Sequence, residues 1–212
     1  MNNNTFVHKY IKPLINKNSV CVDMTLGNGN DSEILCKLAK KVYGIDINDE
    51  AIANSKQRLK DFNNIEYIND NHINIDLYIK NEIDLAIFNL GYLPHSENKN
   101  ITKADETLIA FKKIYHLIKN NGYIIITFYV GHKGGKDEYY ALTNYIKENN
   151  INVIETFSQD KLDSPITYII KKIWKAPYRS LSYYFKGINN WYIIIEGYVS
   201  ARLSHLPCTI MI

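Results

Sequence analysis

The stretch Val22-Asp-Met-Thr-Leu-Gly-Asn-Gly-Asn30 joins an apolar run to a segment of helical period. Residues 19–24 are apolar and β-branched, which predicts a buried strand. Residues 31–41 carry apolar side chains at helical spacing, which predicts a helix. A glycine-containing turn from a strand into a helix is typical of an open α/β sheet, in which ligands bind beyond the carboxyl ends of the strands.

The same alternation of strand and helix continues through most of the chain. We expect further strands at 42–46, 65–70, 84–90, 123–130, 151–157 and 167–173, and helices at 48–62, 71–79, 102–118 and 137–150. Thr102 is expected to cap the helix at 102–118, and Asn120-Asn121-Gly122 to end it. Repeated alternation predicts a mostly parallel sheet with helices on both faces.

The last two predicted strands are joined only by SQDKLDSP (158–165), which is too short for a helical crossover. A connection of this length predicts an antiparallel pair. The fold class is therefore α/β and Rossmann-like, with a seven-stranded, mostly parallel sheet, one antiparallel strand and helices on both faces. The aromatic-rich tail from residue 174 fits no further βα unit.

Composition and charge are those of a globular protein. The 212 residues are 46% hydrophobic and 22% charged, as in ordinary single domains. The net charge is +3, but residues 1–173 hold 21 Lys and Arg and 21 Asp and Glu. A neutral body argues against broad, non-specific binding of nucleic acid, which depends on many phosphate contacts. A local basic patch remains compatible with these numbers.

The cysteines and the apolar runs of the chain indicate in which cellular compartment the protein is expected. The three cysteines have neither paired nor metal-ligand spacing, and Cys21 is expected to be a small core residue. The N-terminus lacks the apolar core of a signal peptide, and no segment reaches the roughly 18 apolar residues of a membrane span. We expect a soluble, cytoplasmic protein that binds neither a membrane nor a metal.

The spacing between the glycine loop and the next strand-end carboxylate is typical of nucleoside-binding sites. Asp46 ends the second predicted strand, 19 residues after Gly27, and a carboxylate about 20 residues beyond such a glycine accepts hydrogen bonds from a ribose diol. Ser32 stands where a dinucleotide fingerprint has its third glycine. Asp70 and Asn71 follow the third strand and can bind an adenine amino group. A nucleoside ligand is predicted, either a nicotinamide dinucleotide or S-adenosylmethionine.

The fourth strand ends in IFNLGYLPH (87–95), which combines an amide, a glycine and an aromatic ring. The Asn89 amide oxygen and the carbonyls near Gly91 can accept the N–H groups of an amine, so that its lone pair faces an electrophile. The Tyr92 ring can stack on the flat base that carries the amine. Methyl transfer from a sulfonium needs this positioning and no metal. A Gly-Pro loop with structural side chains is the alternative.

The fifth strand ends in FYVGHKGGKDE (128–138). Tyr129 and His132 are expected to face the same crevice, and His132 can take up a proton or bind substrate. A structural histidine is the alternative. The other histidines show no ligand spacing, and no metal is proposed for His8, His95, His116 and His205.

Read in order, VDMTLGNGN, GIDIN, NDNH, FNLGYLP and TFYVGHKGG resemble the motifs of the bacterial class I methyltransferases named rRNA methylases, over roughly residues 5–173. The resemblance implies S-adenosylmethionine as cofactor. It implies methylation of the aminomethyl nitrogen of wobble uridine, 5-aminomethyl-(2-thio)uridine, in the anticodon stem-loop of tRNA. Cofactor binding is then assigned to Asp23, Gly27, Asn28, Gly29, Asp31, Asp46, Asn48, Asp70, His72 and Asn89. Catalysis is assigned to Asn89, Tyr92 and His132, and substrate binding to Tyr92, Tyr129 and His132.

The chain departs from the family pattern in three places. Asn30 stands where the family loop has histidine, and Asn71 stands where the third-strand motif has glycine. Residues 1–173 are expected to form the methyltransferase domain, whereas residues 174–212 are an unmatched extension. That tail is an added element, a contact for a homodimer, or the product of frameshifted reading.

Other functions remain open at this point. A methyltransferase acting on rRNA or on a small amine would use the same strand-tip chemistry. A nicotinamide-dependent oxidoreductase is disfavoured by the missing third glycine and the reversed final strand. A catalytically silent nucleoside-binding or RNA-docking protein is disfavoured by the intact set of Asp46, Asp70, Asn89 and Tyr92.

Overall fold

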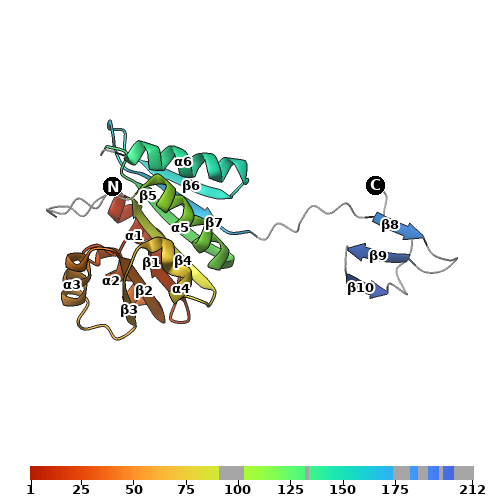
Figure 1. Cartoon of the computed structure of the whole chain (residues 1–212), viewed down its shortest axis with the longest axis horizontal. Helices are drawn as coiled ribbons and strands as arrows, with labels where there is room; N and C mark the ends of the chain where they lie inside the picture. Colours follow the sequence, from red (N-terminus) through yellow and green to blue (C-terminus); the bar gives the residue numbers. More distant parts are fainter. Residues whose placement is uncertain (91–102, 132–133, 174–181, 186–190, 196–197, 203–212) are drawn as a thin grey trace. The chain divides into compact units, whose positions relative to one another are not determined.

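A computed structural model describes residues 1–90, 103–131, 134–173, 182–185, 191–195 and 198–202 (Figure 1). The chain divides into two compact units, Met1–Ile173 and Trp174–Ile212. The first unit carries the residues that the sequence marks as functional, and the two units are described separately.

The first unit is built on a seven-stranded sheet with the strand order β3-β2-β1-β4-β5-β7-β6. Its strands are β1 (Val20–Asp23), β2 (Lys41–Asp46), β3 (Ile65–Asn69), β4 (Ile83–Leu90), β5 (Ile118–Phe128), β6 (Val153–Ser158) and β7 (Ile166–Lys171). β7 pairs antiparallel with both β5 and β6, whereas the pairs among β1 to β5 are parallel. The predicted architecture, including the single reversed strand, is confirmed.

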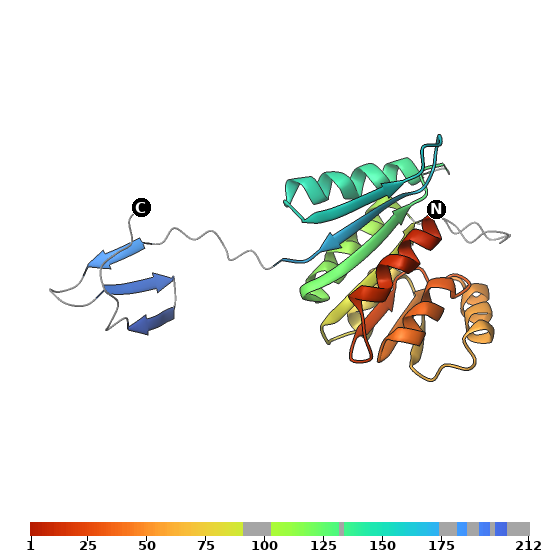
Figure 2. The ribbon, with the colours of Figure 1, turned by 180° about the vertical axis from the view of Figure 1, so that it is seen from behind.

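Helices cover both faces of this sheet (Figures 1 and 2). They are α1 (Asn3–Leu14), α2 (Asn30–Leu38), α3 (Asp49–Arg58), the 3-10 turn η1 (His72–Asn74), α4 (Ile75–Tyr78), α5 (Ala104–Leu117) and α6 (Gly135–Glu148). α4, α5 and α6 pack into one apolar core, and α1 and α2 into the other.

The central strand β4 shows why the sheet is buried on both sides. Leu85 and Ile87 enter the core under α1 and α2, whereas Ala86, Phe88 and Leu90 enter the core under α5 and α6. Successive side chains of a strand point to opposite faces, so a strand covered on both faces is apolar at nearly every position. The continuous run in the sequence therefore reflects two cores rather than one.

Three details differ from the sequence prediction. The helix expected to be capped by Thr102 begins at Ala104, with Lys103 as an N-cap that makes no side-chain bond; Thr102 itself lies outside the described residues. Asn120–Gly122 do not end a helix, because β5 already begins at Ile118. The parallel pairing with β4 is interrupted here, and Asn121 and Gly122 bond instead to the backbone of Lys172.

The third difference is α1, which the sequence reading did not propose. Asn2 caps it, and its oxygen accepts the backbone N–H of Thr5 at 2.8 Å. Its buried side chains include Phe6, Val7 and Ile11. The signal was present as apolar residues at helical spacing behind an asparagine N-cap.

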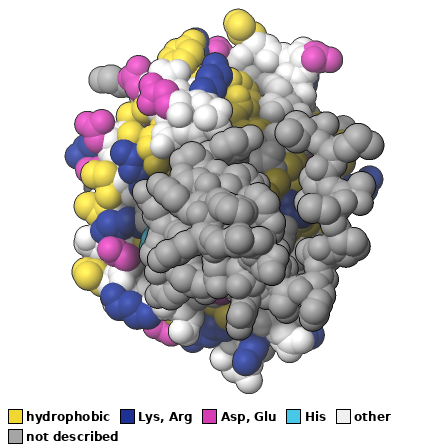
Figure 3. Space-filling view, turned by 90° about the vertical axis from the view of Figure 1, so that its right-hand side faces the viewer, with side chains coloured by type: hydrophobic (Ala, Val, Ile, Leu, Met, Phe, Trp, Pro, Cys, Tyr) yellow, Lys and Arg dark blue, Asp and Glu magenta, His cyan; other side chains and the backbone are white. Residues whose placement is uncertain are grey.

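The second unit contains three short antiparallel strands in the order β10-β9-β8: β8 (Ser182–Phe185), β9 (Trp191–Ile195) and β10 (Tyr198–Arg202). In the first unit Cys21 is fully buried, as predicted, and Cys36 is buried beside it. Among the described residues, the helices are too short or too polar to cross a membrane. Basic and acidic side chains are interspersed over the described surface visible in Figure 3.

Candidate functional site

The carboxyl ends of five neighbouring strands form one edge of the sheet. Because β3, β2, β1, β4 and β5 lie side by side and parallel, their ends bring together polar residues that are distant in sequence. These are Asp23, Asp46, Asp70, Asn89 and Tyr129. Ligands of open α/β sheets bind beyond this edge, so the residues that the sequence singled out lie where a site is expected.

The glycine loop and Asp46 are joined directly. Asp46 Oδ2 accepts the backbone N–H of Gly27 at 2.8 Å, and Oδ1 accepts that of Asn48 at 2.9 Å. Asn48 also begins α3 by capping the backbone N–H of Glu50. Burial raises the pKa of Asp46, whereas these backbone donors oppose the rise. Each carboxylate oxygen retains room for another hydrogen bond, which suits the two hydroxyls of a ribose.

Gly29 serves packing within the loop. Its φ of +76° lies in the left-handed region, and an added Cβ would lie 3.1 Å from Ser55 Cβ and 3.2 Å from Leu59 Cδ1. Glycine therefore lets the start of α2 approach α3 closely. The position of the loop over the sheet edge depends on this contact.

Asp23 is the most deeply buried carboxylate at this edge, with 1% of its surface exposed. Its Oδ2 accepts the hydroxyl of Ser32 at 2.8 Å, and its Oδ1 accepts the backbone N–H of Thr25 at 3.2 Å. Burial, followed by the charge of nearby Asp31, raises the pKa of Asp23 to about 7. Ser32, which replaces the third glycine of a dinucleotide loop, thus anchors a buried acid.

The raised pKa of Asp23 predicts a pH-dependent stability. An unfolded aspartate titrates near pH ~4, so between about pH 4 and pH 7 the folded state binds a proton that the unfolded state has lost. The stabilisation from this group therefore decreases as pH rises through that window. We expect the difference in free energy of unfolding, wild type minus Asp23→Asn, to decrease by on the order of 3 kcal/mol.

Urea denaturation of both proteins at several pH values measures this difference. Asparagine keeps the shape of the side chain, and its amide can donate to the Ser32 hydroxyl, so the variant is expected to fold. A difference that is constant or increases with pH would contradict a buried Asp23 that takes up a proton.

Asp70 is largely engaged by its own neighbours. Oδ1 accepts the backbone N–H of Asn71 at 2.7 Å and the amide of Asn74 at 3.1 Å. Oδ2 accepts the Asn74 amide at 3.1 Å and the Tyr78 hydroxyl at 2.8 Å. The Tyr78 bond is the main reason that the pKa of Asp70 is lowered. Since a carboxylate offers about four acceptor positions, an adenine amino group could bind Asp70 only if Asn74 or Tyr78 moved.

His72, two residues after Asp70, has a ring nitrogen that lacks a hydrogen-bond partner in the described part of the chain. Its Nε2 is buried and has no partner among the described residues. Burial lowers the pKa of His72, although the charge of Glu106 opposes this. The side chain of the adjacent Asn71 is engaged by α5, because its amide donates to Glu106 at 2.9 Å. Buried polar atoms in folded proteins nearly always have a partner, so this nitrogen is an orphaned polar group beside the candidate site.

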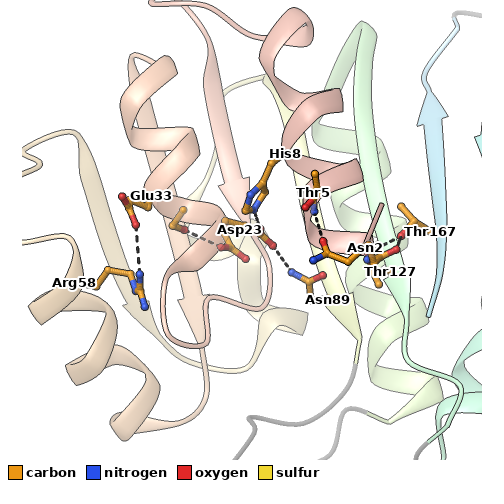
Figure 4. Close-up of polar contacts among 12 residues, drawn as sticks. Asn2, Thr5, His8, Asp23, Glu33, Arg58, Asn89, Thr127 and Thr167 are labelled. Carbon is orange, nitrogen blue, oxygen red and sulfur yellow. Dashed lines mark hydrogen bonds and ion pairs between the residues drawn. The ribbon is translucent and has the colours of Figure 1, made fainter. Parts of the chain in front are cut away.

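The tip of β4 is held by two bonds from Asn89. Its backbone N–H donates to the Thr25 hydroxyl at 2.7 Å, and its side-chain Nδ2 donates to Asp31 Oδ2 at 2.5 Å. The other oxygen of Asp31 lies 2.6 Å from His8 Nε2. Figure 4 shows His8 and Asn89 approaching the same group from α1 and β4. His8 is therefore part of the candidate site, although its spacing in the sequence gave no reason to include it.

The remaining predicted residues are placed as follows. Asn28 is tied to α3, since its Oδ1 accepts from Asn54 at 3.2 Å and its carbonyl accepts from Arg58 Nε at 2.8 Å. Arg58 also forms an ion pair with Glu33 (Figure 4). An open recess here is lined by Asn28, Asn54, Gln57 and Arg58.

Tyr129 follows the end of β5. Its pKa is raised, mainly by burial and then by the charge of Asp31. Tyr92 and His132 lie outside the described residues.

These features fit an adenosine-containing cofactor. Asp46 presents acceptors suited to a ribose diol beside Gly27, whose φ of +50° is a left-handed conformation that glycine adopts without strain. The partnerless nitrogen of His72 lies near the end of the neighbouring β3. Within the described residues, His, Cys, Asp and Glu side chains form no group of three suited to a metal ion.

Comparisons with known proteins point to one family. The family model described as "Putative rRNA methylase" matches residues 42–171. The crystal structure described as "SMU.1697c, a putative methyltransferase from streptococcus mutans in complex with SAH" is 32% identical. It superposes with a TM-score of 0.74 over 82% of this chain and 99% of that chain.

Two curated relatives carry different RNA substrates in their names. The tRNA (mnm(5)s(2)U34)-methyltransferase, chloroplastic, of Arabidopsis thaliana is 30% identical over 147 residues, 62% of this chain and 54% of that protein. Ribosomal RNA small subunit methyltransferase H of Clostridium botulinum (strain 657 / Type Ba4) is 28% identical over 171 residues, 77% of this chain and 51% of that protein. The chain thus spans about half the length of these curated relatives.

Proposed function

This chain belongs to the family described as "Putative rRNA methylase", and we propose that it methylates the aminomethyl nitrogen of wobble uridine in tRNA with S-adenosylmethionine as methyl donor. The family resemblance found in the sequence is confirmed, and so is the cofactor class, given the SAH-bound structure of SMU.1697c. Membership also favours a methyltransferase over the nicotinamide-dependent alternative. The RNA target is the part that we propose.

The observation that carries the proposal is the geometry of Asn89. Its amide nitrogen is committed to Asp31, so the amide oxygen points elsewhere and is available to accept a hydrogen bond. Its backbone is held by Thr25, a residue of the cofactor loop. An acceptor held beside that loop suits an amine that must direct its lone pair at the donated methyl group.

The reaction requires little beyond positioning. S-adenosylmethionine supplies a methyl group on a positively charged sulfur. A primary alkylamine is largely protonated at neutral pH, so the nitrogen first loses a proton to water. Its lone pair then forms the nitrogen–carbon bond while the electrons of the carbon–sulfur bond stay on sulfur, and S-adenosylhomocysteine leaves. The methylated ammonium equilibrates its proton with water, while Asn89 orients the remaining N–H groups.

The choice of tRNA is supported by the Arabidopsis relative, whose name specifies a modified uridine at position 34 of tRNA. Small-subunit ribosomal RNA is the second candidate, supported by the longer match to the Clostridium botulinum protein. Both candidates would use the same strand tip. Only the bound RNA distinguishes them.

The test uses the full chain with S-adenosylmethionine and two RNA substrates. One is tRNA from a strain that lacks the homologous gene, and the other is small-subunit ribosomal RNA from a strain that lacks methyltransferase H. After digestion, nucleosides are identified by mass. We expect 5-aminomethyluridine, with or without the 2-thio group, to become one methylene heavier.

The two substrates also separate the candidate functions. Conversion of a ribosomal nucleoside without conversion of tRNA would replace the wobble-uridine proposal by the second candidate. Binding of S-adenosylhomocysteine without conversion of either RNA would contradict both. A control with the same tRNA, already fully modified, shows that methyl incorporation depends on the unmethylated amine.

A further inference from the structure

A chain of hydrogen bonds connects α1 to the tip of β4 through Asp31. The three residues come from separate elements: His8 from α1, Asp31 from the first turn of α2, and Asn89 from β4. His8 and Asp31 are 23 positions apart, and Asp31 and Asn89 are 58 apart. The site as predicted from the sequence assigned Asp31 to cofactor binding and left His8 without a role.

The chemistry of the carboxylate determines the orientation of its neighbours. An ionised aspartate only accepts hydrogen bonds, so both groups that touch it must donate. The proton on His8 therefore sits on Nε2, and the amide of Asn89 turns its NH₂ toward Asp31. The side chains of His8 and Asp31 are 28% and 12% exposed, so water competes only partly for these bonds.

The orientation of the Asn89 amide matters for an amine substrate. With NH₂ held by Asp31, the oxygen faces the other way and can accept an N–H from the substrate. An amide rotated by half a turn would present NH₂ instead, and this donor would occupy the lone pair that must attack the methyl group. The C=O and NH₂ ends of an amide have nearly the same size and shape, so packing alone cannot select between these two orientations.

The helix that carries His8 is itself firmly placed. Phe6, Val7 and Ile11 are buried against the sheet. Asn3 accepts the hydroxyl of Thr167 at 2.6 Å and donates to that of Thr127 at 3.3 Å, which joins α1 to β7 and β5. A rigid support of this kind can fix the plane of the Asp31 carboxylate.

We propose that His8 and Asp31 are positioning residues that hold the Asn89 amide with its oxygen toward the substrate amine. The effect on catalysis rests on the proposed function, whereas the amide orientation can be measured without any reaction. His8 would act through Asp31 and touch neither cofactor nor RNA. It follows that any side chain at position 8 that donates a hydrogen bond to Asp31 should support the reaction, whether or not it is an aromatic ring.

The first measurement is the side-chain amide signal of Asn89 in ¹H–¹⁵N spectra of the full chain, assigned by its loss in Asn89→Ala. We expect one of its two protons to be shifted downfield and protected from exchange in the wild type. Asp31→Ala should abolish both effects and His8→Leu should weaken them. His8→Gln, whose amide can still donate to Asp31, should preserve them. Identical spectra in Asp31→Ala and wild type would overturn the proposal.

The second measurement is kinetic. His8→Leu is expected to lower kcat by about 10-fold, while the KM for RNA and the Kd for S-adenosylhomocysteine stay within about threefold. His8→Gln should restore most of the rate. His116→Leu, at an exposed histidine of α5, is the matched control and should behave as wild type.

The outcomes are distinguishable from failure of the proposed function. If wild type methylates no RNA amine, the proposed function fails, and the amide spectra still decide the orientation. If wild type is active and His8→Leu loses cofactor affinity as much as kcat, His8 supports the cofactor loop and the proposal is wrong. If His8→Leu does not fold, His8→Gln and Asp31→Ala provide the same comparison.

Discussion

Asn89→Ala is expected to lower the rate of methyl transfer by about 100-fold or more, because the substrate amine loses the acceptor that orients its lone pair. The affinity for S-adenosylhomocysteine should stay within about threefold of wild type, since Asp46 and the glycine loop are untouched. Removal of Asn89 also leaves one oxygen of Asp31 without its partner, so a modest loss of stability should accompany the loss of rate.

Single-turnover methylation of the RNA and calorimetric titration of S-adenosylhomocysteine measure the two effects separately. Asn81→Ala is the matched control, because Asn81 is exposed just before the opposite end of β4. A variant that binds the product normally and transfers methyl at full rate would remove Asn89 from catalysis. Equal losses of rate and affinity would assign Asn89 to cofactor binding alone.

Asp46→Asn is expected to weaken binding of S-adenosylmethionine by about 100-fold. Hydrogen bonds to a charged group contribute about 1.5–3 kcal/mol each, and an amide cannot accept from both hydroxyls of a ribose while it also accepts the N–H groups of Gly27 and Asn48. One of those backbone donors would face the NH₂ of the new side chain. The loop should therefore loosen as well.

Calorimetric titration with S-adenosylmethionine gives the affinity, and thermal unfolding without ligand shows how far the loop is disturbed. Asp61→Asn, at an exposed position beyond α3, controls for the loss of one negative charge. If a folded Asp46→Asn variant bound the cofactor as tightly as wild type does, the ribose would have to be bound elsewhere.

Several features of the site followed from local sequence. Gly27 and Asp46 were paired by their spacing alone, and the structure joins them by a hydrogen bond. This works because the loop after β1 and the end of the adjacent parallel strand β2 must lie side by side in such a fold. Asp70 was placed at the correct strand end for the same reason, but its bonds to Asn74 and Tyr78 could not be foreseen.

The sequence by itself determined the order of the seven strands and of the helices after α1, the one reversed strand, and the row of polar residues at the strand ends, because periodicity and connection length are local properties. Only the tertiary structure decided how the polar groups at this edge pair with one another. It seats His8 against Asp31 and turns the Asn89 amide, and it buries Asp23 enough to raise its pKa to about 7. Hydrogen bonds depend on direction and burial, and these are set only when segments distant in the chain pack together.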